Sequence, residues 1–99
     1  MFDFVDIDAI NYYREAEEKV IFFFEKPWCD SCESFINKIM QVPEDILNVP
    51  VYRVELDMDG GDYIRKQFDV KEAPIAILFT DGKEDKRITD ENLFSSLLS

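Results

Sequence analysis

The chain has 99 residues, 46% of them hydrophobic and 14% aromatic, which is enough apolar surface for a single folded domain over residues 1–99 and excludes a disordered tail. Its formal net charge is −11, it is acidic in both halves, and it contains no histidine. The absence of a basic stripe argues against binding to nucleic acid or to an anionic membrane, and the absence of histidine excludes Ser–His and Cys–His catalysis and imidazole metal sites.

The N-terminal segment and the hydropathy of the chain bear on its cellular location. The longest apolar run, Val20–Phe24, has five residues, whereas a spanning helix needs roughly 20. The segment Met1–Asp6 has neither a positive region nor a continuous apolar region of a signal peptide. We therefore expect a cytosolic protein, and a monomer because so acidic a small domain repels its own copies. In a reducing cytosol, close cysteines are more often catalytic or metal-binding than structural.

The first half of the chain predicts alternating strands and helices. Phe2–Val5 alternates apolar and acidic residues and predicts a short strand, and Asp8 can cap a helix running to about Lys19. Val20–Phe24 is apolar on both faces, which is typical of a central strand. Pro43 and Pro50 bracket a predicted loop. The inward positions of the first helix are Ile10, Tyr13, Ala16 and Val20, and those of the helix after the cysteines are Cys32, Phe35, Ile36, Ile39 and Met40.

The second half predicts a strand, a helix and a charged hairpin. Val51–Leu56 forms a strand with Tyr52, Val54 and Leu56 on one face, and Gly61–Phe68 a helix with Tyr63, Ile64 and Phe68 on one side. Pro74–Phe79 is a strand that begins at proline, Asp81-Gly82 predicts a tight turn, and Glu84–Ile88 is a charged edge strand. Thr89 caps a last helix, whose inward positions are Leu93, Phe94, Leu97 and Leu98. The order βαβαβαββα predicts an α/β domain with a central mixed sheet flanked by helices.

The strongest chemical signal is Trp28-Cys29-Asp30-Ser31-Cys32, a Cys-x-x-Cys sequence where the central strand passes into a helix. Cys32 begins the apolar stripe of that helix and should face the core. Cys29 lies at the helix start, where free backbone N–H groups and the helix dipole stabilise a thiolate. Because the spacer keeps both sulfurs within disulfide reach, we expect Cys29 to be the nucleophile and Cys32 the resolving thiol of a redox-active disulfide.

At this point the chain resembles the thioredoxin family over nearly its whole length. The resemblance rests on the strand 20–24, the Trp28-Cys29-x-x-Cys32 turn, the Val70-x-x-Ala73-Pro74 segment and the Asp81-Gly82 hairpin, in the family's order. It implies a thioredoxin-like fold and a small thiol–disulfide oxidoreductase that reduces protein disulfides without a cofactor and is recharged by a separate reductase. It also implies that Pro74 is cis and faces the active-site cysteines and that the Ala73 backbone pairs with the substrate, so that both residues bind it. We expect Trp28 to contact the substrate rather than the core, because it precedes the exposed nucleophile.

Three departures from the family pattern qualify this expectation. Phe23 stands where thioredoxins carry a buried aspartate, so we expect slower resolution near neutral pH, with water or Glu25 taking the proton from Cys32. Asp30 and Ser31 replace the usual Gly-Pro and should modulate the thiol pKa: Asp30 opposes the thiolate, while Ser31 can donate a hydrogen bond or help to cap the helix. A reducing potential near that of thioredoxin follows. The family's glycine after the edge strand has no counterpart near Ile88-Thr89, so substrate docking there can differ.

Four other interpretations stay open. The cysteines could be a passive pair packed in the core, or they could bind zinc, which needs further ligands from a second chain or from carboxylates such as Asp30 and Glu33. A glutaredoxin-like enzyme coupled to anionic glutathione would favour basic residues near the site, where only Lys26 and Lys71 are expected, and its Cys-Pro-Tyr-Cys turn and later Gly-Gly are missing. The changes at Phe23 and Asp30 also allow a thioredoxin-fold interaction module without general reductase activity.

Overall fold

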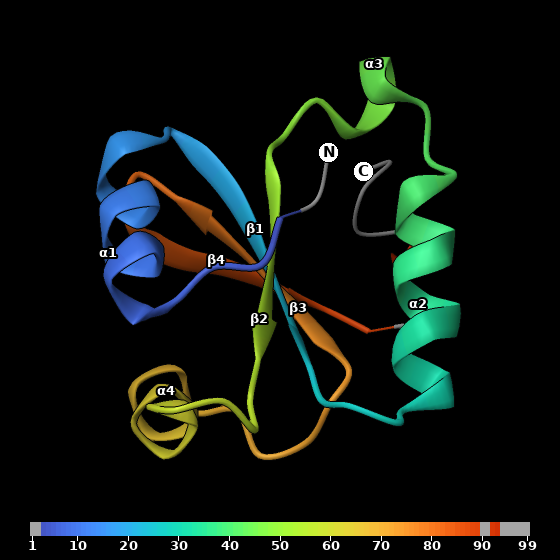
Figure 1. Ribbon diagram of the computed structural model, residues 1–99. Coiled ribbons are helices and arrows are strands. Elements are labelled where there is room, and N and C mark those ends of the chain that lie inside the picture. Colours follow the sequence, from blue (N-terminus) through green and yellow to red (C-terminus); the bar gives the residue numbers. More distant parts are fainter. Residues whose placement is uncertain (1–2, 90–91, 94–99) are drawn as a thin grey trace.

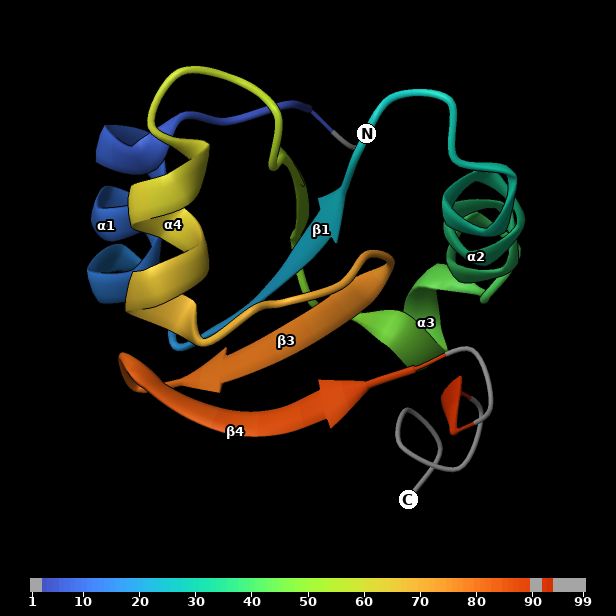
Figure 2. The same ribbon diagram turned by 90° about the horizontal axis from the view of Figure 1, so that it is seen from below.

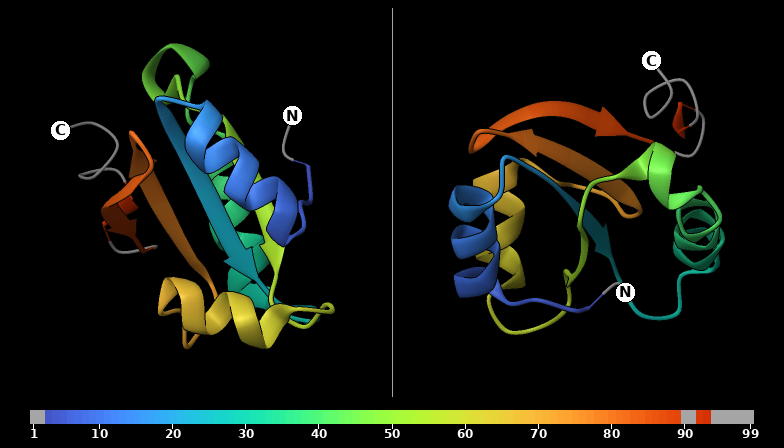
Figure 3. Two further views of the ribbon diagram at one scale, coloured as in Figure 1. Left: turned by 90° about the vertical axis from the view of Figure 1, so that its left-hand side faces the viewer. Right: turned by 90° about the horizontal axis from the view of Figure 1, so that it is seen from above.

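The computed structural model describes residues 3–89 and 92–93, in which a four-stranded sheet separates two groups of helices (Figures 1 and 2). The strand order is β2-β1-β3-β4, with β1 parallel to β2 and the other neighbours antiparallel. Helices α1 and α4 cover one face and α2 covers the other, as Figure 3 also shows. The elements are α1 (Ile7–Ala16), β1 (Lys19–Glu25), α2 (Asp30–Met40), α3 (Glu44–Leu47), β2 (Val51–Glu55), α4 (Gly61–Phe68), β3 (Ile75–Thr80) and β4 (Lys83–Ile88).

Strand β1 organises the core because it is central and buried on both faces. Side chains of a strand point to opposite faces in turn. Phe22 and Phe24 pack beneath α1 and α4, and Phe23 packs beneath α2. All three phenylalanine side chains are fully buried. The expected central strand and the mixed, helix-flanked sheet are thus confirmed, and the two hydrophobic layers hold the end of β1 in place before the cysteines.

The hairpin at the far edge of the sheet also follows the prediction. Asp81 and Gly82 both have positive φ, at 52° and 80°, as a tight two-residue turn between strands requires. Strand β4 is the edge strand, and its exposed positions carry charged side chains. These charges discourage further strand pairing at that edge. Within the described residues, no helix is both long and apolar enough to cross a membrane.

The start of the chain differs from the prediction. Of the strand predicted over Phe2–Val5, the described residues from Asp3 on form only an isolated parallel bridge between Phe4 and Arg53, and Phe2 lies outside the described residues. Asp6, not Asp8, caps α1 by accepting a hydrogen bond from the Ala9 N–H at 2.9 Å. The helix therefore begins two residues earlier than predicted.

Other differences come from the limits of one-dimensional patterns. Helix α1 ends at Ala16, which is exposed, because Lys19 already pairs with Thr80 in the sheet. The predicted loop between the two prolines contains the one-turn helix α3. Met40 and Tyr63 are 49% and 59% exposed, since each lies one position, or about 100° of helix rotation, beside the buried stripe. The helix predicted after Thr89 falls largely outside the described residues, although Leu93 is buried there.

Helix α4 begins at a glycine because the preceding loop leaves no room for a side chain. A Cβ atom on Gly61 would lie 1.8 Å from the backbone oxygen of Leu56. We expect Gly61→Ala to destabilise the fold by about 1–3 kcal/mol, because backbone must move to relieve this overlap. Urea unfolding followed by circular dichroism measures the loss. Lys66→Ala, an exposed change in the same helix, is the control and should cost under about 0.5 kcal/mol; equal midpoints for both variants would contradict the prediction.

Candidate active site

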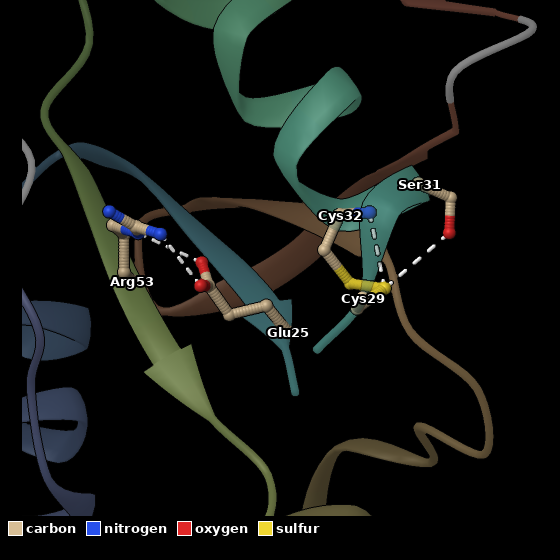
Figure 4. The surroundings of a disulfide bond; sticks show 5 residues. All are labelled: Glu25, Cys29, Ser31, Cys32 and Arg53. Atoms are coloured by element: carbon tan, nitrogen blue, oxygen red, sulfur yellow. Dashed lines mark hydrogen bonds and ion pairs between the residues drawn. A yellow bond between two sulfur atoms is a disulfide. The ribbon is translucent and has the colours of Figure 1, made fainter. Parts of the chain in front are cut away.

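The two cysteines form a disulfide at the N-terminus of α2, with their Cα atoms 5.2 Å apart (Figure 4). Cys29 is the N-cap residue, and its sulfur accepts a hydrogen bond from the Cys32 backbone N–H at 3.1 Å. The Ser31 hydroxyl lies 3.4 Å from the same sulfur and donates to it, because a disulfide sulfur carries no proton. In the reduced protein these donors and the helix dipole would stabilise a Cys29 thiolate.

The two sulfurs occupy different environments. Cys32 is 3% exposed and lies within the cluster between the sheet and α2, as the apolar stripe predicts. Cys29 is only partly buried and packs at the margin of that cluster. An incoming disulfide can therefore reach Cys29 and not Cys32. This asymmetry fits the predicted division into an attacking and a resolving thiol.

The neighbours of Cys29 are open to solvent. Trp28 is 98% exposed, with a left-handed backbone at φ 54°, so it is not a core residue. Asp30 and Ser31 are exposed in the first turn of α2, and so is Glu33. The surface beside the reactive sulfur thus offers one large apolar side chain and two carboxylates.

The loop before β3 also reaches the site. The Ala73–Pro74 peptide bond is cis, as the family resemblance implies. Ala73 is partly buried and, like Cys29, packs against the cluster that contains Cys32. The predicted place for a substrate backbone thus packs against the same hydrophobic cluster as the cysteines, although the two segments are more than 40 positions apart in sequence.

A partly buried ion pair lies beside the disulfide (Figure 4). Glu25 is 8% exposed, and both its carboxylate oxygens accept hydrogen bonds from Arg53 on β2, at 2.7 and 2.8 Å. The hydrogen bond from Arg53 to this carboxylate raises the pKa of Arg53, so the guanidinium stays charged. The guanidinium also lies over the ring of Phe4, with the Arg53 Cζ atom 4.4 Å from the ring centre. Both oxygens of the Glu25 carboxylate are thus engaged by Arg53. Among the described residues, no hydrogen bond links Glu25 to Cys32.

Breaking this pair should be costly although it does not touch the disulfide. We expect Glu25→Gln to lower the free energy of unfolding by about 1–3 kcal/mol, because Arg53 would keep its charge while its partner loses the negative charge and one of its two acceptor oxygens. Urea unfolding of Glu25→Gln, Arg53→Gln and the double variant measures the coupling. The double variant should be more stable than the sum of the two losses implies. Strict additivity would show that the pair contributes nothing specific.

The structure also brings a third cation, which the sequence did not indicate, together with Lys26 and Lys71. Arg65 of α4, 36 positions after Cys29, lines a cavity of about 450 Å³ together with Lys26, Lys71 and Ala73. The remaining lining residues are Leu56, Asp57 and Glu72. The helical periodicity of α4 indicates which of its residues face the core. It does not indicate which loops lie beside the rest of the helix, and so it could not place Arg65 near Lys26 and Lys71. Across residues 3–89 and 92–93, no three Cys, Asp or Glu side chains are placed to hold a metal ion together.

Comparisons with known proteins agree with this geometry. The sequence profile of the family described as Thioredoxin matches residues 7–99. A curated relative, the mitochondrial thioredoxin O of Oryza sativa subsp. japonica, is 23% identical over 79 residues, which are 79% of this chain; the chain spans 45% of that relative's length.

Solved structures of very low sequence identity share the fold. Thioredoxin f2 of Chlamydomonas reinhardtii superposes with a TM-score of 0.81 at 18% identity, over 99% of this chain and 93% of its own. Spinach chloroplast thioredoxin F gives 0.82 at 14% identity, over 97% and 88%. The oxidised thioredoxin of Plasmodium falciparum gives 0.80 at 14% identity, over 98% and 94%.

Proposed function

This chain belongs to the thioredoxin family and carries the Cys-x-x-Cys disulfide of a thiol–disulfide oxidoreductase, and we propose that it acts as a reductase of protein disulfides. The observation that carries the proposal is the asymmetry of the pair: a partly exposed Cys29 at a helix N-terminus, and a Cys32 that is 3% exposed. A reducing compartment such as the cytosol is part of the proposal, since the dithiol must be regenerated there.

The proposed reaction exchanges one disulfide for another. The Cys29 thiolate attacks one sulfur of the substrate disulfide, the substrate S–S bond breaks, and the leaving thiolate takes a proton from water. The Cys32 sulfur, after losing its proton, then attacks Cys29 and releases the second substrate thiol. The products are two substrate thiols and the Cys29–Cys32 disulfide, so two electrons have passed to the substrate. A separate reductase returns two electrons and two protons to the pair.

Substrate binding in this proposal uses the surface around Cys29. An extended substrate segment would add to the backbone at Ala73, and the exposed ring of Trp28 would cover its apolar side chains. Asp30, one residue after Cys29, disfavours the thiolate, and Ser31 favours it. We expect a reduction potential nearer the roughly −270 mV of thioredoxin than the −120 mV of DsbA, and a value above about −180 mV would contradict this.

Reduction of insulin disulfides in dithiothreitol tests the proposed function. The wild-type protein should accelerate insulin precipitation over dithiothreitol alone. The control is the same protein reduced, alkylated with iodoacetamide and dialysed, which keeps the fold and blocks the exposed sulfur. Acceleration that alkylation removes supports a protein-disulfide reductase. The absence of acceleration in a protein with a native circular dichroism spectrum would instead favour an interaction module.

A further inference from the structure

The cavity lined by Lys26, Arg65 and Lys71, defined above, is a cationic site in a strongly acidic protein. Its three cations outnumber its two carboxylates, Asp57 and Glu72, whereas the chain as a whole carries a net charge of −11. The segments after β1 and β2 and the loop before β3 meet at one end of the strands (Figure 1). These segments supply Lys26, Asp57 and Lys71 to the lining of the cavity. The local charge balance is thus the reverse of that of the molecule.

The cations of this cavity have unused hydrogen-bonding capacity. Arg65 pairs with Asp57 at 3.2 Å through one terminal nitrogen, but its buried Nε has no acceptor among the described residues. Lys26 and Lys71 are exposed, and neither makes an ion pair or hydrogen bond within the described part of the chain. A cluster of three cations with one internal partner favours an anionic ligand, because charge-assisted hydrogen bonds to a carboxylate are the strong ones.

The position of the cavity connects it to the redox site. Ala73 belongs to the lining of the cavity and, like Cys29, packs against the hydrophobic cluster that contains Cys32. Lys26 lies three residues before Cys29, between the end of β1 and the helix N-terminus. A substrate segment docked along Ala73 would therefore carry the side chains next to its disulfide past these cations.

We infer that this cavity receives an acidic side chain adjoining the substrate disulfide, so that the protein prefers disulfides flanked by aspartate or glutamate. This inference rests on the proposed reductase function and specifies its substrate class. The remaining surface is acidic and repels such substrates at long range, so the cavity gives a local attraction that opposes this repulsion. The preference would be greatest at low ionic strength because exposed charges are screened by salt.

Two peptide disulfides that differ only in glutamate or glutamine beside the cysteines provide the test. We expect the wild-type kcat/KM to be about threefold to fivefold higher for the glutamate peptide at low ionic strength, a size typical of an exposed ion pair, and the ratio to fall as salt is added. The double variant Lys26→Gln/Lys71→Gln should bring the ratio to one or below. Arg65→Gln should lower it as well.

A matched control separates the local effect from the change in net charge. Lys19→Gln/Lys83→Gln removes the same number of charges from exposed positions at the opposite end of the strands, and it should keep the wild-type ratio. Equal ratios for the two double variants would overturn the inference.

The remaining outcomes keep the two proposals apart. If the wild type reduces both peptides equally well, the reductase function stands and the acidic preference fails. If it reduces neither peptide, the reductase function itself fails. Reduction of glutathione disulfide that depends on Lys26 and Lys71, without preference between the peptides, would assign the cavity to the tripeptide and overturn the inference.

Discussion

Replacing Cys29 by serine should reduce insulin reduction to the rate of dithiothreitol alone. A hydroxyl in place of the sulfur cannot form the thiolate that the helix N-terminus stabilises, and the buried Cys32 cannot take over because it is 3% exposed. Cys32→Ser should also lose turnover, but at a later step. It should form a mixed disulfide with the substrate and stop there, since no second sulfur can release it.

Mass spectrometry of the two variants after mixing with oxidised insulin distinguishes these steps. The Cys32→Ser protein should gain the mass of an insulin molecule, whose two chains stay joined by their second interchain disulfide, in a bond that dithiothreitol reverses. The Cys29→Ser protein should gain nothing. An adduct on Cys29→Ser of equal yield would assign the attack to Cys32 and reverse the proposed roles. The two serine variants control for each other, since they differ only in which sulfur remains.

The resolving step itself should be slow near neutral pH. Phe23 offers no carboxylate to accept the proton of Cys32, and the Glu25 carboxylate is held by Arg53 on both oxygens. Stopped-flow mixing of the reduced protein with a peptide disulfide separates formation of the mixed disulfide from its decay. Rapid decay at pH 7 would show that another route, such as water at the partly exposed Cys29, carries the proton.

The largest loss of stability is expected for Phe23→Ala. Its side chain is fully buried, and its ring meets Phe35 edge to face at a centroid distance of 5.4 Å. Truncation leaves a cavity between β1 and α2 and should cost about 3–5 kcal/mol. That is a large share of the roughly 5–15 kcal/mol that a small domain has in total.

Urea unfolding by circular dichroism measures this loss directly. Tyr63→Ala is the control, because it removes an aromatic ring that is 59% exposed and should cost under about 1 kcal/mol. A Phe23→Ala loss as small as that of the control would mean that the layer beneath α2 refills the space. That result would mean that the Phe23 ring, which stands where the family carries an aspartate, is not needed to fill the layer beneath α2.

Local patterns predicted the parts of the site that lie close together in sequence. The step from β1 into α2 fixes both cysteines, since a buried strand, a short turn and an apolar helical stripe leave few arrangements for residues 29 and 32. Hydrophobic spacing likewise identified the central strand and all the buried residues of α2. Its one error in that helix was Met40, which was expected to face inward and is exposed. The cis bond before Pro74 followed from the family resemblance and not from any local pattern.

Contacts between distant segments were not accessible in the same way. Glu25 and Arg53 are 28 residues apart in the sequence, and their contact depends on the register of β1 and β2. In that register Glu25 lies opposite Glu55 in the ladder, and its side chain reaches Arg53. Arg65 meets Lys26 and Lys71 only because α4 lies beside the loops at one end of the strands. The first cap was misassigned because Asp6 and Asp8 are equally suitable by residue type, and the packing of α1 decides between them.

The exposure of Trp28 determines which optical signals are informative in this protein. It is the only tryptophan in the chain, and its indole is already surrounded by water in the folded state. Its fluorescence will therefore change little when the core unfolds, and an unfolding curve followed at this wavelength would miss the transition. Because the indole adjoins Cys29, the same emission should respond to quenching by the disulfide and to a docked substrate. Tryptophan fluorescence thus reads the redox state of this molecule rather than its fold.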